Sequence, residues 1–211
     1  MTRYRAVIFD LGGVVMPSPL DAFRAFERRH GLPHRFISEV VVSGGEHGAW
    51  SRFERGELTL ETFAEAFEAE CAAAGGRVVT SELLAEIRSG SGPRPPMVTA
   101  IGAIREQGLR TAALTNNWPD AGANGVSRCA GLDGLFDLVV ESAVEGVRKP
   151  DVRIYELTLS RLDVTPSEAV FLDDLGTNLK PARAMGMTTI KVDDVDAALA
   201  ELEAVLGFAV G

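Results

Sequence analysis

The stretch AVFLDDLGTN at residues 169–178 decides the fold class, because an apolar run of strand length ends there in two adjacent acids. Residues 169–172 carry no polar side chain, which is typical of a parallel strand covered on both faces. Asp173 and Asp174 follow at the carboxyl end, where open α/β sheets bind their ligands. Two adjacent carboxylates repel each other unless a cation lies beside them, so this stretch predicts a metal site at a sheet edge.

Four other short apolar runs predict the rest of the sheet. They cover residues 5–9, 111–114, 138–140 and 188–192. Helical patterns separate most of these runs, and most of the patterns stop just before a glycine that can close a helix. The helical patterns cover residues 97–107, 151–162, 175–185 and 195–206. Alternating strands and helices predict an α/β fold with a doubly wound, Rossmann-like parallel sheet.

Residues 17–91 break this alternation, since they contain no run typical of a buried strand. Amphipathic helical patterns cover residues 20–30, 60–73 and 81–88, and the Gly/Pro-rich stretch GSGPRPP at 90–96 predicts a hinge. An insertion directly after the first strand would lie over the ligand-binding edge of the sheet. We therefore predict a helical cap domain at 17–91, inserted into a core domain formed by residues 1–16 and 92–211.

Composition and charge exclude several classes of protein. The chain has 211 residues, of which 46% are hydrophobic and 24% charged, and these values fit a soluble globular domain. A net charge of −9 argues against nucleic acid as a partner. The apolar runs are far shorter than the roughly 20 residues of a membrane-spanning helix, which argues against a membrane. We expect a monomer or homodimer.

The N-terminal apolar stretch stops at Asp10, too early for a signal peptide, so we expect a cytoplasmic protein. Cys71 and Cys129 lie far apart with no spacing typical of a zinc site or a disulfide framework. We expect both to be reduced thiols.

Three further polar clusters fall at the ends of predicted strands. They are DLGG at 10–13, TNN at 115–117 and RKPD at 148–151. Asp10 could act as a nucleophile that forms a covalent intermediate, Thr115 and Asn116 could hydrogen-bond phosphate oxygens, and Lys149 could neutralise a phosphate and a carboxylate together. Each cluster alone also fits an ordinary turn or a solvated helix start. All of them together, at one edge of one sheet, predict a site for phosphoryl transfer.

In this order, with a helical insertion after the first, the four clusters resemble the sequence motifs of the haloacid dehalogenase superfamily. More narrowly, ALTNNW at 113–118, RKPD at 148–151 and FLDDLGTNLKPA at 171–182 resemble the phosphatase-like N-terminal domain of soluble epoxide hydrolase. DLGGV at 10–14 and GGEHGAW at 44–50 also fit the similar domain of an acyl-CoA dehydrogenase family member. The resemblance spans essentially the whole chain, and it implies a magnesium-dependent hydrolase of small phosphorylated metabolites.

The resemblance also implies roles for individual residues. Asp10 would attack phosphorus and form an aspartyl-phosphate, with Lys149 as the second catalytic residue. Mg²⁺ would be held by the carboxylates of Asp10 and Asp174 and by the carbonyl of Gly12.

Phosphate would be bound by Thr115, Asn116 and Lys149. Asp173 and Asn178 match positions that lie behind the metal ligands and support them.

Gly12 departs from the family's phosphatase pattern Asp-x-Asp, in which the second carboxylate serves as general acid and base. Such catalysis typically contributes about 10²–10⁴-fold. Two alternatives therefore stay open. A 2-haloacid dehalogenase expels halide without a proton, and a degenerate domain would bind phosphorylated ligands without turnover. The acidic pair at 173–174 argues against the first, and the retained Asp10 and Lys149 argue against the second.

The predicted cap offers candidates for substrate contact. Trp50, Phe53 and Trp118 could form an aromatic wall for the leaving group, or they could be core aromatics. His47, in a glycine-rich stretch, could supply the missing proton.

Overall fold

The computed structural model describes residues 4–90, 92–119, 132 and 134–211. Its centre is a five-stranded parallel sheet in the order β3-β2-β1-β4-β5. The strands are β1 (Ala6–Phe9), β2 (Arg110–Thr115), β3 (Leu138–Glu141), β4 (Ala169–Asp173) and β5 (Thr188–Lys191). The predicted α/β class is confirmed, and all five strands lie where the apolar runs placed them.

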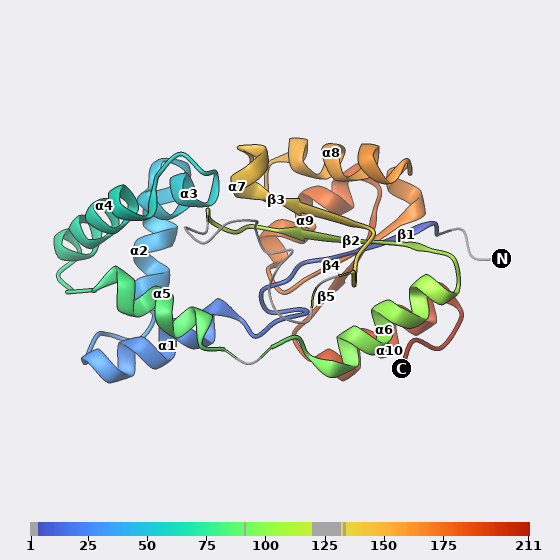
Figure 1. The fold of residues 1–211 in the computed structure, drawn as a ribbon, viewed down its shortest axis with the longest axis horizontal. Helices are drawn as coiled ribbons and strands as arrows, with labels where there is room; N and C mark the ends of the chain where they lie inside the picture. Colours follow the sequence, from blue (N-terminus) through green and yellow to red (C-terminus); the bar gives the residue numbers. More distant parts are fainter. Residues whose placement is uncertain (1–3, 91, 120–131, 133) are drawn as a thin grey trace.

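Helices cover both faces of the sheet (Figure 1). The alternation of side chains along β1 shows why. Val7 and Phe9 pack into a cluster with helices α6 (Pro95–Glu106) and α10 (Val195–Leu206). Ala6 and Ile8 point to the opposite face, toward α8 (Val152–Leu162) and α9 (Gly176–Met185). Because both faces are buried, a strand with no polar side chain is stable here.

The helix ends follow local sequence signals. Gly186 closes α9 with a φ of 103°, and Gly207 closes α10 with a φ of 81°, both in the left-handed region that favours glycine. Asp151 and Asp194 cap the N-termini of α8 and α10 through their side chains. Helices α9 and α10 therefore end at the glycines predicted from the sequence.

The stretch between β1 and α6 is helical, and we call residues 19–88 the helical insertion. It contains α1 (Pro19–His30), α2 (Phe36–Gly44), the short 3₁₀ helix η1 (Gly45–His47), α3 (Ala49–Glu54), α4 (Leu60–Ala73) and α5 (Thr80–Arg88). These helices lie beyond the carboxyl ends of the strands (Figure 1). They enclose an apolar cluster of their own, separate from the two clusters that flank the sheet. That the insertion is a separate domain bounded at 17 and 91 stays a prediction.

The aromatic candidates of the insertion are mostly core residues. Trp50 and Phe53 are buried, and the ring of Phe53 stacks on Phe63 at 4.0 Å between centroids. Trp118, which follows β2 in the core, is half-buried and lies 6.0 Å from Trp50 and 6.1 Å from Phe53. A residue of the core thus packs against the apolar cluster of the insertion.

The described residues also form two short helices, α7 (Ser142–Glu145) directly after β3 and η3 (Pro166–Glu168) before β4. Helix α7 contacts α3, so it joins the sheet to the insertion. Among the described residues, no helix is long and apolar enough to cross a bilayer. Cys71 is a buried free thiol, whereas Cys129 lies outside the described residues.

Candidate active site

The polar clusters that follow separate strands meet at the carboxyl edge of the sheet. Asp10 follows β1, Thr115 ends β2, and Asp173 ends β4. Strand β1 pairs with both β2 and β4, so these three chain segments are direct neighbours. The register brings Asp10 close to residues that lie more than 100 positions away in sequence.

Lys149 lies at the centre of the site and is fully buried. Its Nζ is 2.9 Å from Oδ2 of Asp10 and 2.7 Å from Oδ2 of Asp173. Burial opposes the charge of the ammonium group, but the two carboxylates outweigh it and raise the pKa of Lys149. The side chain is therefore a fixed positive charge between two acids.

Asp173 is held on several sides. Its Oδ1 accepts hydrogen bonds from the backbone N–H of Leu175 at 2.8 Å and from Nδ2 of Asn178 at 3.0 Å. Its Oδ2 accepts the bond from Lys149. Charge-assisted hydrogen bonds of this kind fix both the carboxylate and its lysine partner. Asp173 and Asn178 thus orient Lys149 from behind, whereas their support of metal ligands stays a prediction.

Asp10 and Asp174 have fewer partners. Oδ1 of Asp10 accepts from the backbone N–H of Leu11 at 2.7 Å, and Oδ2 of Asp174 accepts from the Ser18 hydroxyl at 3.5 Å. Burial raises the pKa of Asp10 well above its usual range despite Lys149, and Asp173 and Asp174 add to this through repulsion. Burial and the charge of Asp173 likewise raise the pKa of Asp174 to about 6. The carboxylates of Asp10 and Asp174 are therefore surrounded by more negative than positive charge.

Glycines let the chain after Asp10 approach Asp174 closely. Gly13 has a φ of 82°, and a Cβ on it would lie 2.2 Å from Oδ2 of Asp174. No side chain fits there, so glycine at position 13 is required by the site itself. Gly12 is less confined, because a Cβ on it would lie 3.1 Å from Cδ of Pro19.

Thr115 and Asn116 lie beside Lys149. The side-chain amide of Asn116 holds the backbone of Lys149 at both ends: Oδ1 accepts from its N–H at 2.8 Å, and Nδ2 donates to its carbonyl at 3.0 Å. The Thr115 hydroxyl donates a long hydrogen bond of 3.4 Å to the Asn116 carbonyl. The structure thus gives Asn116 a role in placing Lys149, while its contact with phosphate stays a prediction.

A comparison with known families identifies the chain. The model of the haloacid dehalogenase-like hydrolase family matches residues 4–186. This chain belongs to that family. The resemblance found in the sequence motifs is therefore confirmed, and the chain is a hydrolase of the haloacid dehalogenase type.

Named relatives agree with this assignment. The chain is 46% identical over 208 residues to mouse acyl-CoA dehydrogenase family member 10, covering 97% of this chain but 19% of that protein. It is 38% identical over 215 residues to pig bifunctional epoxide hydrolase 2, covering 96% of this chain and 39% of that protein. The sesquiterpene phosphatase astK of Aspergillus oryzae is 28% identical, and the alignment covers 98% of both chains.

A solved structure supports the fold. A dehalogenase crystallised as an intermediate complex superposes with a TM-score of 0.71 over 98% of each chain, at 19% identity. This similarity concerns the fold alone.

The carboxylates at the centre of this haloacid dehalogenase-like hydrolase fit a divalent cation. Asp10, Asp173 and Asp174 each present a carboxylate oxygen, and these oxygens lie within 4.8 Å of one another. Three carboxylates face one ammonium group, so the ionised cluster would carry more negative than positive charge. Hard oxygen donors are those that Mg²⁺ prefers, and a bound cation lowers the pKa of neighbouring acids. Lys149 bonds both Asp10 and Asp173, and Asn178 also bonds Asp173, so that Asp10 and Asp174 hold the ion stays a prediction.

Sequence reasoning missed a set of residues next to the site. They are Glu54, Arg148 and Ser142, which make hydrogen bonds between the core and the insertion. Glu54 and Arg148 are 94 positions apart, and neither belongs to a local pattern that signals pairing. Arg148 lies in the RKPD stretch at 148–151, but that pattern predicted a role for Lys149 and none for Arg148.

Proposed function

We propose that this chain is a magnesium-dependent phosphatase of small phosphorylated metabolites that forms an aspartyl-phosphate on Asp10. The observation that carries the proposal is the pair of contacts around Asp10. Lys149 lies 2.9 Å away on one side, and Asp174 adds a second acid to the oxygen cluster on the other. A cation and an ammonium group beside one carboxylate keep it ionised and reduce its repulsion of an anionic substrate.

The reaction divides into two displacements at phosphorus. A carboxylate oxygen of Asp10 attacks the phosphoryl group, and the bond to the leaving oxygen breaks with its electron pair. Water then attacks the phosphorus of the aspartyl-phosphate, which releases inorganic phosphate and restores the carboxylate. Lys149 offsets the negative charge on the phosphoryl oxygens during both steps.

Asp10, Asp174 and the carbonyl of Gly12 are the groups that would hold Mg²⁺. When bound, the ion supplies charge neutralisation at the phosphoryl group. Thr115 and the backbone around Asn116 would bind the remaining phosphoryl oxygens by hydrogen bonds.

Gly12 restricts which leaving groups the proposed phosphatase would accept. With glycine at this position, no side chain two residues after the nucleophile can protonate the leaving oxygen. An ester whose leaving group is stable as an anion, such as an aryl phosphate, needs that proton least. We therefore expect slow turnover overall and a strong preference for good leaving groups. The name of the sesquiterpene phosphatase supports phosphate esters as the substrate class.

The same glycine favours one other candidate, a 2-haloacid dehalogenase. There Asp10 would attack carbon and expel halide, a step that requires no acid. Asp174 argues against it, because displacement of halide from a carboxylate-bearing substrate gains nothing from another acid beside the nucleophile.

The experiment is a phosphate-release assay on an aryl phosphate, with and without Mg²⁺, for wild type and Asp10→Asn. The matched control is Asp163→Asn, which changes an exposed aspartate whose side-chain partner is Arg5 at 3.9 Å. We expect magnesium-dependent release that Asp10→Asn abolishes and Asp163→Asn preserves.

A parallel assay measures halide released from 2-haloacids. Halide release without Mg²⁺, together with no phosphate release across a panel of esters, would establish the dehalogenase. Binding of inorganic phosphate without either activity would establish a degenerate binding domain.

A further inference from the structure

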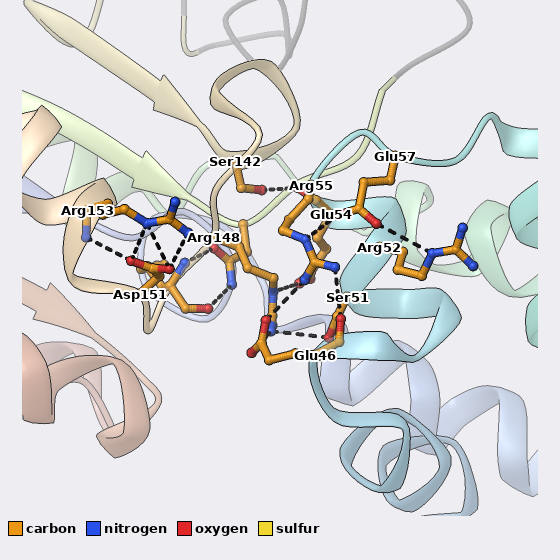
Figure 2. Close-up of polar contacts among 12 residues, drawn as sticks. Glu46, Ser51, Arg52, Glu54, Arg55, Glu57, Ser142, Arg148, Asp151 and Arg153 are labelled. Carbon is orange, nitrogen blue, oxygen red and sulfur yellow. Dashed lines mark hydrogen bonds and ion pairs between the residues drawn. The ribbon is translucent and has the colours of Figure 1, made fainter.

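A polar junction joins the end of α3 to the loop that carries Lys149. Figure 2 shows Glu54, Ser51 and Glu46 of the insertion turned toward Arg148 and Ser142 of the core. Arg148 immediately precedes Lys149, so the junction lies one peptide bond from the residue whose ammonium group is at the centre of the site.

Glu54 is the most fully engaged residue of this junction. It is buried, its Oε1 accepts from Nε1 of Trp50 at 2.9 Å, and its Oε2 accepts from Nε of Arg148 at 2.7 Å. Its backbone carbonyl accepts the hydroxyl of Ser142 at 2.6 Å. Two of these three contacts cross from the insertion to the core, one through the side chain and one through the backbone.

Arg148 contacts other groups of the insertion besides Glu54. Its Nη1 donates to the Ser51 hydroxyl at 3.2 Å and lies 3.5 Å from Oε1 of Glu46. A guanidinium that bonds through more than one nitrogen is fixed in orientation as well as in place. The backbone of residue 148 is thereby tied to helix α3.

The chain continues directly from this tie to the site. The backbone of Lys149 is held by Asn116 at its N–H and its carbonyl, and its Nζ lies between Asp10 and Asp173. Ser142, on the core side of the junction, also accepts the backbone N–H of Asn117 at 2.9 Å. The contacts of Glu54 with Arg148 and with Ser142 therefore both adjoin segments that hold Lys149.

We propose that Glu54 and Arg148 are positioning residues, which set the place of the Lys149 ammonium group through the seating of helix α3 on the core. The inference rests on the proposed function, since Lys149 matters for rate only if the site turns over. A buried ion pair is a poor source of stability, because desolvation of both charges offsets their attraction. The ion pair between Glu54 and Arg148 instead fixes the position of the backbone next to Lys149. A misplacement of about 1 Å at a catalytic group can reduce the rate on the order of 100-fold.

The test compares Glu54→Gln, Arg148→Gln and the double variant with wild type. The Glu54→Gln change keeps the size of the side chain and an acceptor for Trp50, but it removes the charge that holds Arg148. The matched control is Arg153→Gln, because Arg153 is exposed and pairs with Asp151 of its own helix start (Figure 2). The measurements are kcat on an aryl phosphate per folded molecule and hydrogen exchange at the backbone amide of Lys149.

We expect each single variant to reduce kcat on the order of 100-fold and to speed exchange at Lys149. The double variant should be no slower than the singles, because both act through one contact. Arg153→Gln should match wild type in both measurements. A purely structural pair would lower the free energy of unfolding and leave kcat per folded molecule unchanged.

Wild-type exchange at Lys149 in a folded Glu54→Gln variant overturns the proposal. If Glu54→Gln does not fold, Arg148→Lys replaces it, since lysine keeps a charge beside Glu54 but lacks the rigid planar donors with which Arg148 contacts Glu54 and Ser51. Unchanged exchange and kcat in that variant also overturn it. If wild type itself shows no turnover, the proposed function fails, and exchange at Lys149 alone decides whether the junction positions it.

Discussion

Asp173 and Asp174 are neighbours in sequence, yet their surroundings are opposite. Asp173 is fully buried and receives hydrogen bonds from Lys149, Asn178 and the backbone of Leu175. Asp174 is half-buried, accepts one long bond from the Ser18 hydroxyl, and has a pKa raised to about 6 by burial and by Asp173. The protein's own groups neutralise and hydrogen-bond the carboxylate of Asp173. The carboxylate of Asp174, by contrast, lies among excess negative charge.

The difference separates the two halves of the site by role. The half around Asp173 and Lys149 is assembled by the fold and would hold its geometry without a ligand. The half around Asp10 and Asp174 concentrates negative charge and reaches its functional charge state only with a cation. Substitutions in the first half should therefore damage the fold, and those in the second should damage binding and rate.

The largest effect is expected for Lys149→Met. The change leaves Asp10 and Asp173 buried without their shared counter-charge, and breaking a buried pair in this way costs roughly 3–5 kcal/mol. Urea denaturation without Mg²⁺ measures the free energy of unfolding. Lys180→Met, at an exposed position of α9, is the control and should change it little. Equal stability of the two variants would mean that the half around Asp173 does not support the fold.

Asp174→Asn should behave in the opposite way. Removing this charge relieves repulsion with Asp173, so the free energy of unfolding without Mg²⁺ should not fall. Wild type should gain about 2.7 kcal/mol when Mg²⁺ is present at 100 times its Kd, and the variant should lose this gain. Urea denaturation with and without Mg²⁺ checks both statements. A clear loss of stability in the metal-free variant would contradict the comparison.

Gly12→Asp should restore a proton donor to the open half. We expect kcat on alkyl phosphates to rise on the order of 100-fold, the lower end of what general acid catalysis contributes. Gly12→Asn is the matched control, because it meets the same Pro19 contact at 3.1 Å without carrying a titratable proton. Equal rates for the two variants would show that the missing acid does not limit turnover.

The smallest effect is the pH dependence of Mg²⁺ binding. Mg²⁺ binds the ionised carboxylate, and the pKa of Asp174 is raised to about 6, so protons compete below that pH. Affinity should be full well above pH 6 and should fall about tenfold per pH unit below it for one released proton. The raised pKa of Asp10 makes the fall steeper. Calorimetric titration at several pH values measures this, and a constant Kd between pH 7 and pH 5 would contradict it.

The sequence predicted the sheet well because its signal is local. Strands β1, β2 and β4 each contain a short run of buried apolar residues, and this pattern is typical of a parallel sheet covered on both faces. The helix ends at Gly186 and Gly207 are also local, since each depends on one backbone conformation. The convergence of Asp10, Lys149 and Asp173 followed from strand ends meeting at one edge.

The junction of core and insertion was not predictable in the same way. Helix α3 spans six residues, too short for a clear hydrophobic period, and its partner α7 spans four. The bond between Glu54 and Arg148 joins positions 94 apart, and local spacing carries no information about it. Trp50 and Phe53 were ambiguous for a related reason, since an aromatic side chain suits a core and a binding wall equally.

The most direct test of Asp10 as the phosphorylated nucleophile is chemical trapping during turnover of an aryl phosphate. Acid quenching followed by borohydride reduces an aspartyl-phosphate to homoserine, and peptide mass spectrometry locates the modified residue. We predict homoserine at position 10, formed only when both substrate and Mg²⁺ are present. Turnover without homoserine at position 10, or homoserine at Asp173 or Asp174 instead, would contradict this account of the site.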